Sequence, residues 1–354
     1  MSGRSTAARL AARDERLEEL RAVIGEPRPG SAILPERIWT VLEGRYDRVV
    51  GPLIERTWPP GDDPENREHF LGKSRFIARR YASLAYVPVA LAAASPLRSI
   101  PLGGALQRLT LGAALGVAEP LVKRASAALV PALLATAPID ARTTDLLAGL
   151  CTAYDQQFDD WADGFDPVER HHHIERLFRD PEADPPGPEP ASTALTRALL
   201  VELEPRLGER YEELVDLGRE ASAAEMRVDL GEPDPESLSH RRAAAEGTVD
   251  AMMLQSDSVA PAVREWMRDL AVFTQLTDDW VDAETDMDLR ETPVLTGAVG
   301  IEDLAARWAE LLEGSASMLR ASGITEPRTT ELVEGGVRYV LWSGIEGMDH
   351  RIAD

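Results

Sequence analysis

The sequence predicts an all-α protein, built as a bundle of helices without a sheet. Helix-forming residues dominate the 354-residue chain, and the Val/Ile/Thr alternation typical of half-buried strands is almost absent. Hydrophobic residues make up 44% of the chain, which is enough for a sizeable core. Charged residues make up 28%, a proportion typical of soluble globular proteins.

Glycine and proline clusters separate the expected helices. The first helix covers 8–24 and ends where Gly25 to Gly30 interrupt it; the second covers 35–56 and ends before Pro59 and Pro60. A third stretch, 65–95, begins polar and becomes apolar, and a loop is expected at 179–192. The remaining expected helices span 193–228, 236–256, 261–287, 302–322 and 327–349. We expect an N-terminal helical extension over 1–64 and one helical domain over 65–354.

The segment 82–139 is the most apolar part of the chain. Pro, Arg and Lys interrupt it before it reaches the roughly 18–20 apolar residues that a membrane span needs. We interpret it as core helices of the bundle. The alternative is a surface that rests on a membrane or admits an oily substrate.

The charge and cysteine content exclude some functions. The chain has 61 acidic and 38 basic residues, so its formal net charge of −23 argues against binding nucleic acid. Cys151 is the only cysteine, which rules out an intrachain disulfide. The first residues lead into a charged stretch rather than an apolar leader. We therefore expect a cytoplasmic protein.

Two aspartate clusters carry the functional prediction. One runs from Tyr154 to Asp163 and the other from Gln275 to Asp286, and each contains Asp-Asp-x-x-Asp. Residues four apart share a helix face, which gives two ladders: Asp155, Asp159 and Asp163, and Asp278, Asp282 and Asp286. Like charges at this spacing destabilise a helix by about 0.2–0.5 kcal/mol per pair. Each ladder therefore needs a cation or full solvation.

Mg²⁺ would supply that cation, because it prefers oxygen ligands and completes its shell with substrate phosphates. The alternative is that both runs are solvated helix faces. The predicted metal ligands are Asp155, Asp159, Asp160, Asp163, Asp278, Asp279, Asp282 and Asp286. The six residues of the two Asp-Asp-x-x-Asp motifs among them are also the predicted catalytic set.

Other side chains suit a phosphorylated, apolar substrate. Arginine binds phosphate in a bidentate manner, and the candidates by position are Arg227, Arg241, Arg242 and Arg338. Aromatic side chains near the two clusters are the candidates for lining a pocket: Tyr154, Phe158, Trp161, Phe273 and Trp280. We interpret His171-His172-His173 as a solvated segment.

These motifs resemble those of the trans-isoprenyl diphosphate synthase and class I terpene synthase superfamily, over roughly residues 140–300. Phe273 to Asp282 is similar to the "FQ…DDxxD" segment of prenyl synthases, and Arg338-Tyr339 resembles an Arg-Tyr pair found late in bacterial cyclases. The resemblance implies a class I terpenoid synthase helical bundle. It also implies up to about three Mg²⁺ ions, with Mn²⁺ as an alternative, that help to ionise an allylic prenyl diphosphate.

The departures from the family pattern favour a one-substrate enzyme. The lysine that elongating synthases carry before the second motif is absent, and so is their Gly-Gly-Lys-Arg signature. We therefore expect a class I terpene synthase that acts on a linear prenyl diphosphate of C15 or longer. The Asn/Ser/Glu metal motif of common bacterial cyclases is absent as well.

Several alternatives stay open. One is a prenyltransferase that elongates prenyl diphosphates or couples them as in squalene or phytoene formation. Another is a non-catalytic partner subunit of a prenyl synthase, and a third is a metal-dependent phosphohydrolase. The sequence also leaves open a homodimer and a peripheral contact with a membrane.

Overall fold

In the computed structural model, every regular element among the described residues is a helix, as predicted. The described residues are 6–28, 44, 46–58, 67–68, 70–72, 75, 141–161, 166–183, 189–230, 235–254, 261–289, 299–321, 334–336, 338–339 and 341–342. The apolar segment 82–139 lies outside them. No described helix is long and apolar enough to cross a membrane.

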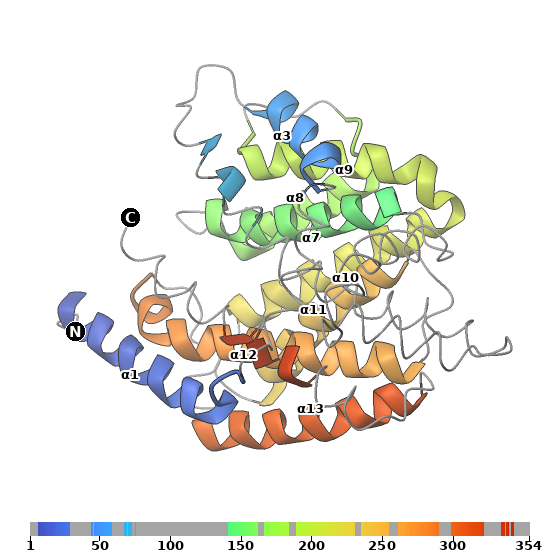
Figure 1. The fold of residues 1–354 in the computed structure, drawn as a ribbon. Helices are drawn as coiled ribbons and strands as arrows, with labels where there is room; N and C mark the ends of the chain where they lie inside the picture. The colour runs from blue at the N-terminus through green and yellow to red at the C-terminus, as the bar shows by residue number, and fades with distance from the viewer. Residues whose placement is uncertain are drawn as a thin grey trace, which may run out of the picture.

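The helices form two layers with a pair of helices between them (Figure 1). The upper layer holds α3 (Gly51–Thr57), α7 (Ala141–Trp161), α8 (Pro167–Arg179) and α9 (Ala191–Leu207). The lower layer holds α1 (Thr6–Ile24), α12 (Pro261–Leu289) and α13 (Ile301–Ala321). Between them lie α10 (Tyr211–Leu230) and α11 (Pro235–Met253), which pack on each other.

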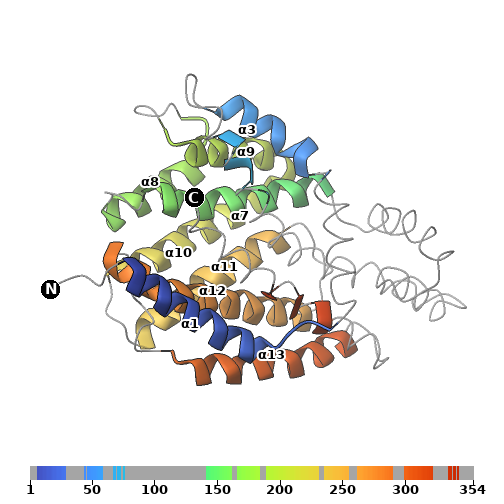
Figure 2. The ribbon, with the colours of Figure 1, turned by 60° about the vertical axis from the view of Figure 1, so that its left-hand side comes forward.

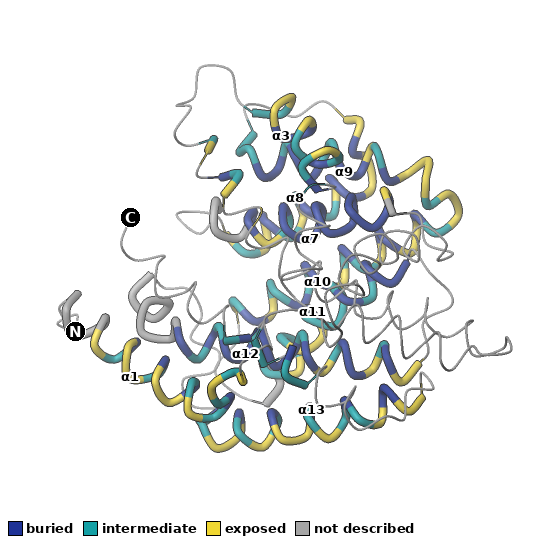
Figure 3. The backbone as a smooth tube through the Cα atoms, viewed as in Figure 1, coloured by how far each residue is buried: buried dark blue, intermediate teal, exposed yellow. Residues whose placement is uncertain are grey.

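Each layer has its own hydrophobic core. The upper core gathers Leu146, Leu147, Leu199 and Leu200 with other side chains of α3 and α7 to α10, and the lower core gathers side chains of α1 and α11 to α13. Figure 3 shows α7 buried along most of its length, whereas α1 and α13 expose one face each. The pattern in α1 and α13 is that of amphipathic helices on the surface of a core.

The helix predictions agree with the described structure except at two places. One is the helix expected at 35–56, where a turn at Val50 separates residues 46–49 from α3. The helices expected at 8–24, 236–256, 261–287 and 302–322 are present as α1, α11, α12 and α13. The single helix expected at 193–228 is wrong, because α9 ends at Leu207 and a short 3₁₀ turn, η2 (Gly208–Arg210), precedes α10. Gly208 has a positive φ of 57°, which favours glycine, and Pro205 lies in the last turn of α9.

The N-terminal helices pack on the rest of the bundle. Helix α1 lies against α12 and α13, and α3 lies against α9. Figure 2 shows α1 crossing α12 beside α13. The expected boundary at residue 64 stays a prediction.

Candidate functional site

The two helices that carry the aspartate clusters end on the same side of the bundle. The C-terminal parts of α7 and α12 lie at one end of the molecule in both views (Figures 1 and 2). The C-terminal part of α10 and the first turns of α8 and α11 supply the charged side chains between them. This end of the bundle is the candidate site.

Arg241 of α11 joins two of the helices at this end. Its Nε and Nη2 each donate to a carboxylate oxygen of Asp279, at 2.9 Å, and its Nη1 donates to Glu225 Oε2 at 2.6 Å. Gln275 Nε2 also donates to Asp279 Oδ1, at 3.2 Å. The side chain of Asp279 is 10% exposed and that of Arg241 is 17% exposed. Such a bidentate pair is both strong and geometrically specific.

A second ion pair extends the network toward α7. Arg170 of α8 pairs with Asp229 of α10. Burial raises the pKa of the Tyr154 hydroxyl well above its ordinary value. The negative charges of Glu225 and Asp155 act in the same direction, and the positive charge of Arg170 opposes them. Tyr154 therefore stays neutral beside the carboxylates of Glu225 and Asp155.

Burial and charge act against each other within the Arg241–Asp279 pair. Burial raises the pKa of Asp279 to about 6, although Arg241 favours the carboxylate form. Burial by itself would lower the pKa of the Arg241 guanidinium. The negative charges of Asp279, Glu225 and Asp229 have the larger effect and raise this pKa. Both groups are therefore charged at neutral pH, and Asp279 needs its partner to remain so.

The described network carries an excess of negative charge. Its carboxylates number five against two guanidiniums, so the formal charge is −3 when all are ionised; the groups are Asp155, Glu225, Asp229, Asp278 and Asp279 with Arg170 and Arg241. Hard oxygen donors with excess negative charge suit Mg²⁺. Among the described side chains, however, no three acidic, histidine or cysteine groups cluster closely enough to hold an ion.

The remaining predicted ligands lie where only the backbone is described, or outside the described residues. Helix α7 continues to Trp161 and α12 to Leu289, so both ladders stand largely on helix, as predicted. The side chains of Phe158, Asp159, Asp160, Trp161, Asp282 and Asp286 lie outside the described part, and so does all of Asp163. Asp155 is exposed on α7, and Asp278 is half-buried on α12.

The four predicted arginines lie in different places. Arg241 belongs to the carboxylate network, whereas Arg242 is exposed and pairs with Glu246 and Asp269. Arg227 is exposed on α10. Arg338 lies near the end of α1, with Tyr339 half-buried beside it in sequence. Of the four, the structure brings Arg241 alone into the described carboxylate network.

The predicted aromatic residues are also divided. Tyr154 contacts the upper core and meets the Phe178 ring edge-on, with ring centres 6.1 Å apart. Trp280 is half-buried next to Asp279 and packs against the lower core. Phe273 is almost fully buried, and its ring stacks on Trp308 with centres 5.5 Å apart. Phe273 therefore serves the packing between α12 and α13.

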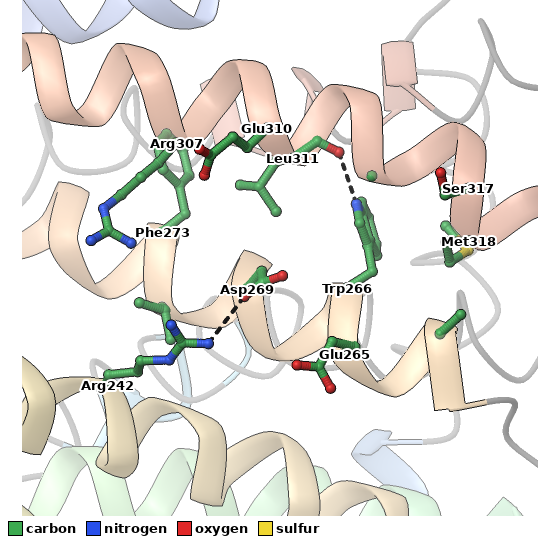
Figure 4. A pocket seen from close by; sticks show the side chains of 13 residues that line it. Arg242, Glu265, Trp266, Asp269, Phe273, Arg307, Glu310, Leu311, Ser317 and Met318 are labelled. Atoms are coloured by element: carbon green, nitrogen blue, oxygen red, sulfur yellow. Dashed lines mark hydrogen bonds and ion pairs between the residues drawn. The ribbon is translucent and has the colours of Figure 1, made fainter.

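A pocket of about 330 Å³ lies between α12 and α13, on another part of α12 (Figure 4). Trp266 and Leu311 line it from opposite helices, and Trp266 Nε1 donates to the Leu311 carbonyl at 2.9 Å. Its charged lining includes both signs: Arg242, Arg307, Glu265, Asp269 and Glu310. This balance does not favour a diphosphate, so we place the candidate site at the carboxylate network instead.

Sequence reasoning assigned no role to three members of the network: Arg170, Glu225 and Asp229. Glu225 and Asp229 are four residues apart on α10, the same spacing as in the aspartate ladders. That spacing is a signal by which they could have been found. Arg170 comes after an Asp-Pro helix start and has no comparable signal.

The histidine run is less solvated than expected. His172 is exposed, but His171 and His173 are half-buried on α8. His171 Nδ1 lies 2.6 Å from the hydroxyl oxygen of Ser222, which is buried. Burial lowers the pKa of both His171 and His173. His171 therefore contributes to the contact of α8 with α10.

Comparisons with known proteins do not assign a family. No protein-family model matches the chain, and neither a curated protein nor a solved structure is significantly similar to it.

Proposed function

We propose that the protein is a Mg²⁺-dependent class I terpene synthase that ionises a linear prenyl diphosphate of C15 or longer. One observation carries the proposal: the carboxylate excess lies at the end of the bundle where both aspartate-rich helices end. A site with surplus carboxylates and a buried arginine suits a ligand made of divalent cations and diphosphate.

The metal ligands in this proposal are Asp278, Asp282 and Asp286 on α12, with Asp155 and Asp159 on α7. Carboxylate oxygens are the donors that Mg²⁺ prefers. When bound, Mg²⁺ would neutralise the negative charge that develops on the departing diphosphate. Asp279 has another role in the proposal, because both of its oxygens already accept hydrogen bonds from Arg241.

The protein's own residues would orient the substrate and direct the fate of the carbocation. The substrate C–O bond breaks, its electron pair leaves with the diphosphate, and the remaining allylic carbocation loses a proton to the released diphosphate to give a hydrocarbon. Arg241 holds α10, α11 and α12 at one end, so the charged groups stay fixed while the bond breaks. Trp280 and Tyr154 offer aromatic surface near the acidic groups.

The test uses purified protein with Mg²⁺ and C10 to C25 prenyl diphosphates, each with and without isopentenyl diphosphate. Products are separated by chromatography and identified by mass, and released inorganic diphosphate is measured separately. We expect a cyclic or rearranged hydrocarbon, and a rate at least about 100-fold lower in Asp278→Ala and Asp159→Ala. Asp216→Ala is the matched control, because Asp216 is exposed on α10 and pairs with Arg219 three residues away on the same helix.

Other outcomes would reassign the protein. Formation of longer diphosphates from isopentenyl diphosphate would make it a prenyltransferase. Release of a simple prenyl alcohol with phosphate would favour the phosphohydrolase. Absence of turnover with every substrate, at low and at high salt, would contradict the enzyme proposal and leave the partner subunit as the leading alternative.

A further inference from the structure

The N-terminal helix α1 packs directly on the helix that carries the second aspartate cluster. Leu17, Leu20 and Ile24 form one face of α1, and each is at most 1% exposed in the lower core. Helix α1 lies on α12 and α13 (Figure 2), and these three side chains share one core with side chains of both helices. Glu18 is exposed, and it pairs at 2.7 Å with Arg21, whose side chain is 21% exposed at the edge of that face.

Arg16, on the same helix, contacts α12 immediately after the Asp278-Asp279 pair. Its Nη1 donates to the carbonyl oxygen of Trp280 at 2.7 Å. Its guanidinium carbon also lies 4.8 Å from the centre of the Trp280 ring, a cation–π distance. One side chain therefore holds both the backbone and the indole of Trp280.

The other end of α1 is held by an arginine from far along the chain. Arg338 Nη1 donates to the carbonyl oxygen of Ile24 at 2.5 Å, and its guanidinium carbon lies 5.8 Å from the ring centre of Trp308. Gly25 has a φ of 73°, and a Cβ there would lie 2.6 Å from Arg338 Nη1. Glycine at this position therefore lets Arg338 close the end of α1.

The C-terminal half of α12 has a physical reason to need such a contact. From Asp278 to Asp288 it carries six acidic residues and no basic one. Like charges four apart destabilise a helix, and acidic residues are unfavourable at the negative end of the helix dipole. A cation supplied by another element offsets part of this cost.

We propose that α1 acts as a clasp, meaning that its contacts stabilise the C-terminal half of α12, and that Arg16 is a positioning residue for the second aspartate motif. Arg16 fixes the turn at Trp280, and the next turns of the helix keep Asp282 and Asp286 in register with Asp278. Its effect on catalysis rests on the proposed terpene synthase function. Its effect on the order of α12 does not.

The test combines hydrogen exchange with Mg²⁺ dependence. In Arg16→Ala we expect amide exchange in peptides covering 276–289 to rise at least about tenfold, while the rest of the chain changes little. The Mg²⁺ concentration for half-maximal diphosphate release should rise by about tenfold as well. Arg16→Lys keeps a cation and a donor, and it should restore part of both effects.

Arg21→Ala is the matched control on the same helix, because the ion pair that Arg21 makes with Glu18 lies within α1. It should leave exchange and Mg²⁺ dependence unchanged. Unchanged exchange at 276–289 in Arg16→Ala overturns the clasp, and so does an increase spread over the whole chain. If the wild-type protein turns over no prenyl diphosphate, the proposed function fails, while the exchange data still decide the role of Arg16.

Discussion

Replacing Arg241 by methionine tests the electrostatic reasoning most directly. Methionine has a similar length but no charge, so Arg241→Met leaves the carboxylates of Asp279 and Glu225 facing each other without a cation. The side chains of these two acids are 10% and 16% exposed, so water compensates little. Removing one partner of a buried ion pair costs about 3–5 kcal/mol, and we expect a loss of unfolding free energy in that range.

The neighbouring residue gives a matched control. Arg242 also pairs with two carboxylates, those of Glu246 and Asp269, but its side chain is 47% exposed. Exposed ion pairs contribute about 0–1 kcal/mol, so Arg242→Met should cost no more than that. Urea unfolding at pH 7, monitored by circular dichroism, measures both variants.

A double variant separates the charge from the packing. In Arg241→Met with Asp279→Leu, one buried carboxylate is removed along with the guanidinium, so much of the loss should be recovered. The reasoning is refuted if Arg241→Met costs as little as Arg242→Met. That outcome would mean that water solvates the pair and that Asp279 is not held in a low-dielectric environment.

Three buried groups give further predictions. Burial raises the pKa of Asp279 to about 6, well above that of an aspartate in the unfolded chain. The unfolding free energy of the wild type, minus that of Asp279→Asn, should therefore fall by about 3 kcal/mol between pH 4 and pH 6 and stay constant above pH 6. Urea unfolding of both proteins across this pH range checks it. A Cβ at Gly218 would lie 2.4 Å from the Phe178 ring, so Gly218→Ala should lower the unfolding free energy by about 1–3 kcal/mol, whereas Gly72→Ala, which meets nothing within 4 Å, should not lower it. Burial, aided by Asp155, raises the pKa of Cys151 to about 12, so maleimide at pH 8 should label this thiol only after unfolding.

The helical fold could be predicted from the sequence because its signals are local. Apolar periodicity and Gly/Pro breaks predicted α1 and α11 to α13 closely. The missed break at Gly208 has a different cause: the residues on both sides of it favour helix, and a single glycine in a helical pattern does not decide between a kink and an end.

The candidate site was less predictable because it depends on pairings between helices. The spacing of the aspartates can be read from the sequence, but the partner of Asp279 cannot. Arg241 and Arg242 are adjacent and chemically identical, yet the first is in the network and the second lies beside a pocket on another part of α12. Helix rotation decides between them, and rotation is set by the packing of α10, α11 and α12.

The two aspartates at the start of the second motif have different roles for a geometric reason. Successive residues on a helix point about 100° apart, so Asp278 and Asp279 cannot share one partner face. Asp279 faces Arg241 in the interior, whereas Asp278 begins the ladder that Asp282 and Asp286 continue.

If the proposed function holds, Asp278→Asn should lower diphosphate release by at least about 100-fold at saturating Mg²⁺. It should also retain most of the fall in unfolding free energy between pH 4 and pH 6, reduced because the charge of Asp278 contributes to the raised pKa of Asp279. Asp279→Asn should lose that pH dependence and keep its response to Mg²⁺. A normal rate in Asp278→Asn would show that this division between an ion-pairing aspartate and a metal-binding one is wrong.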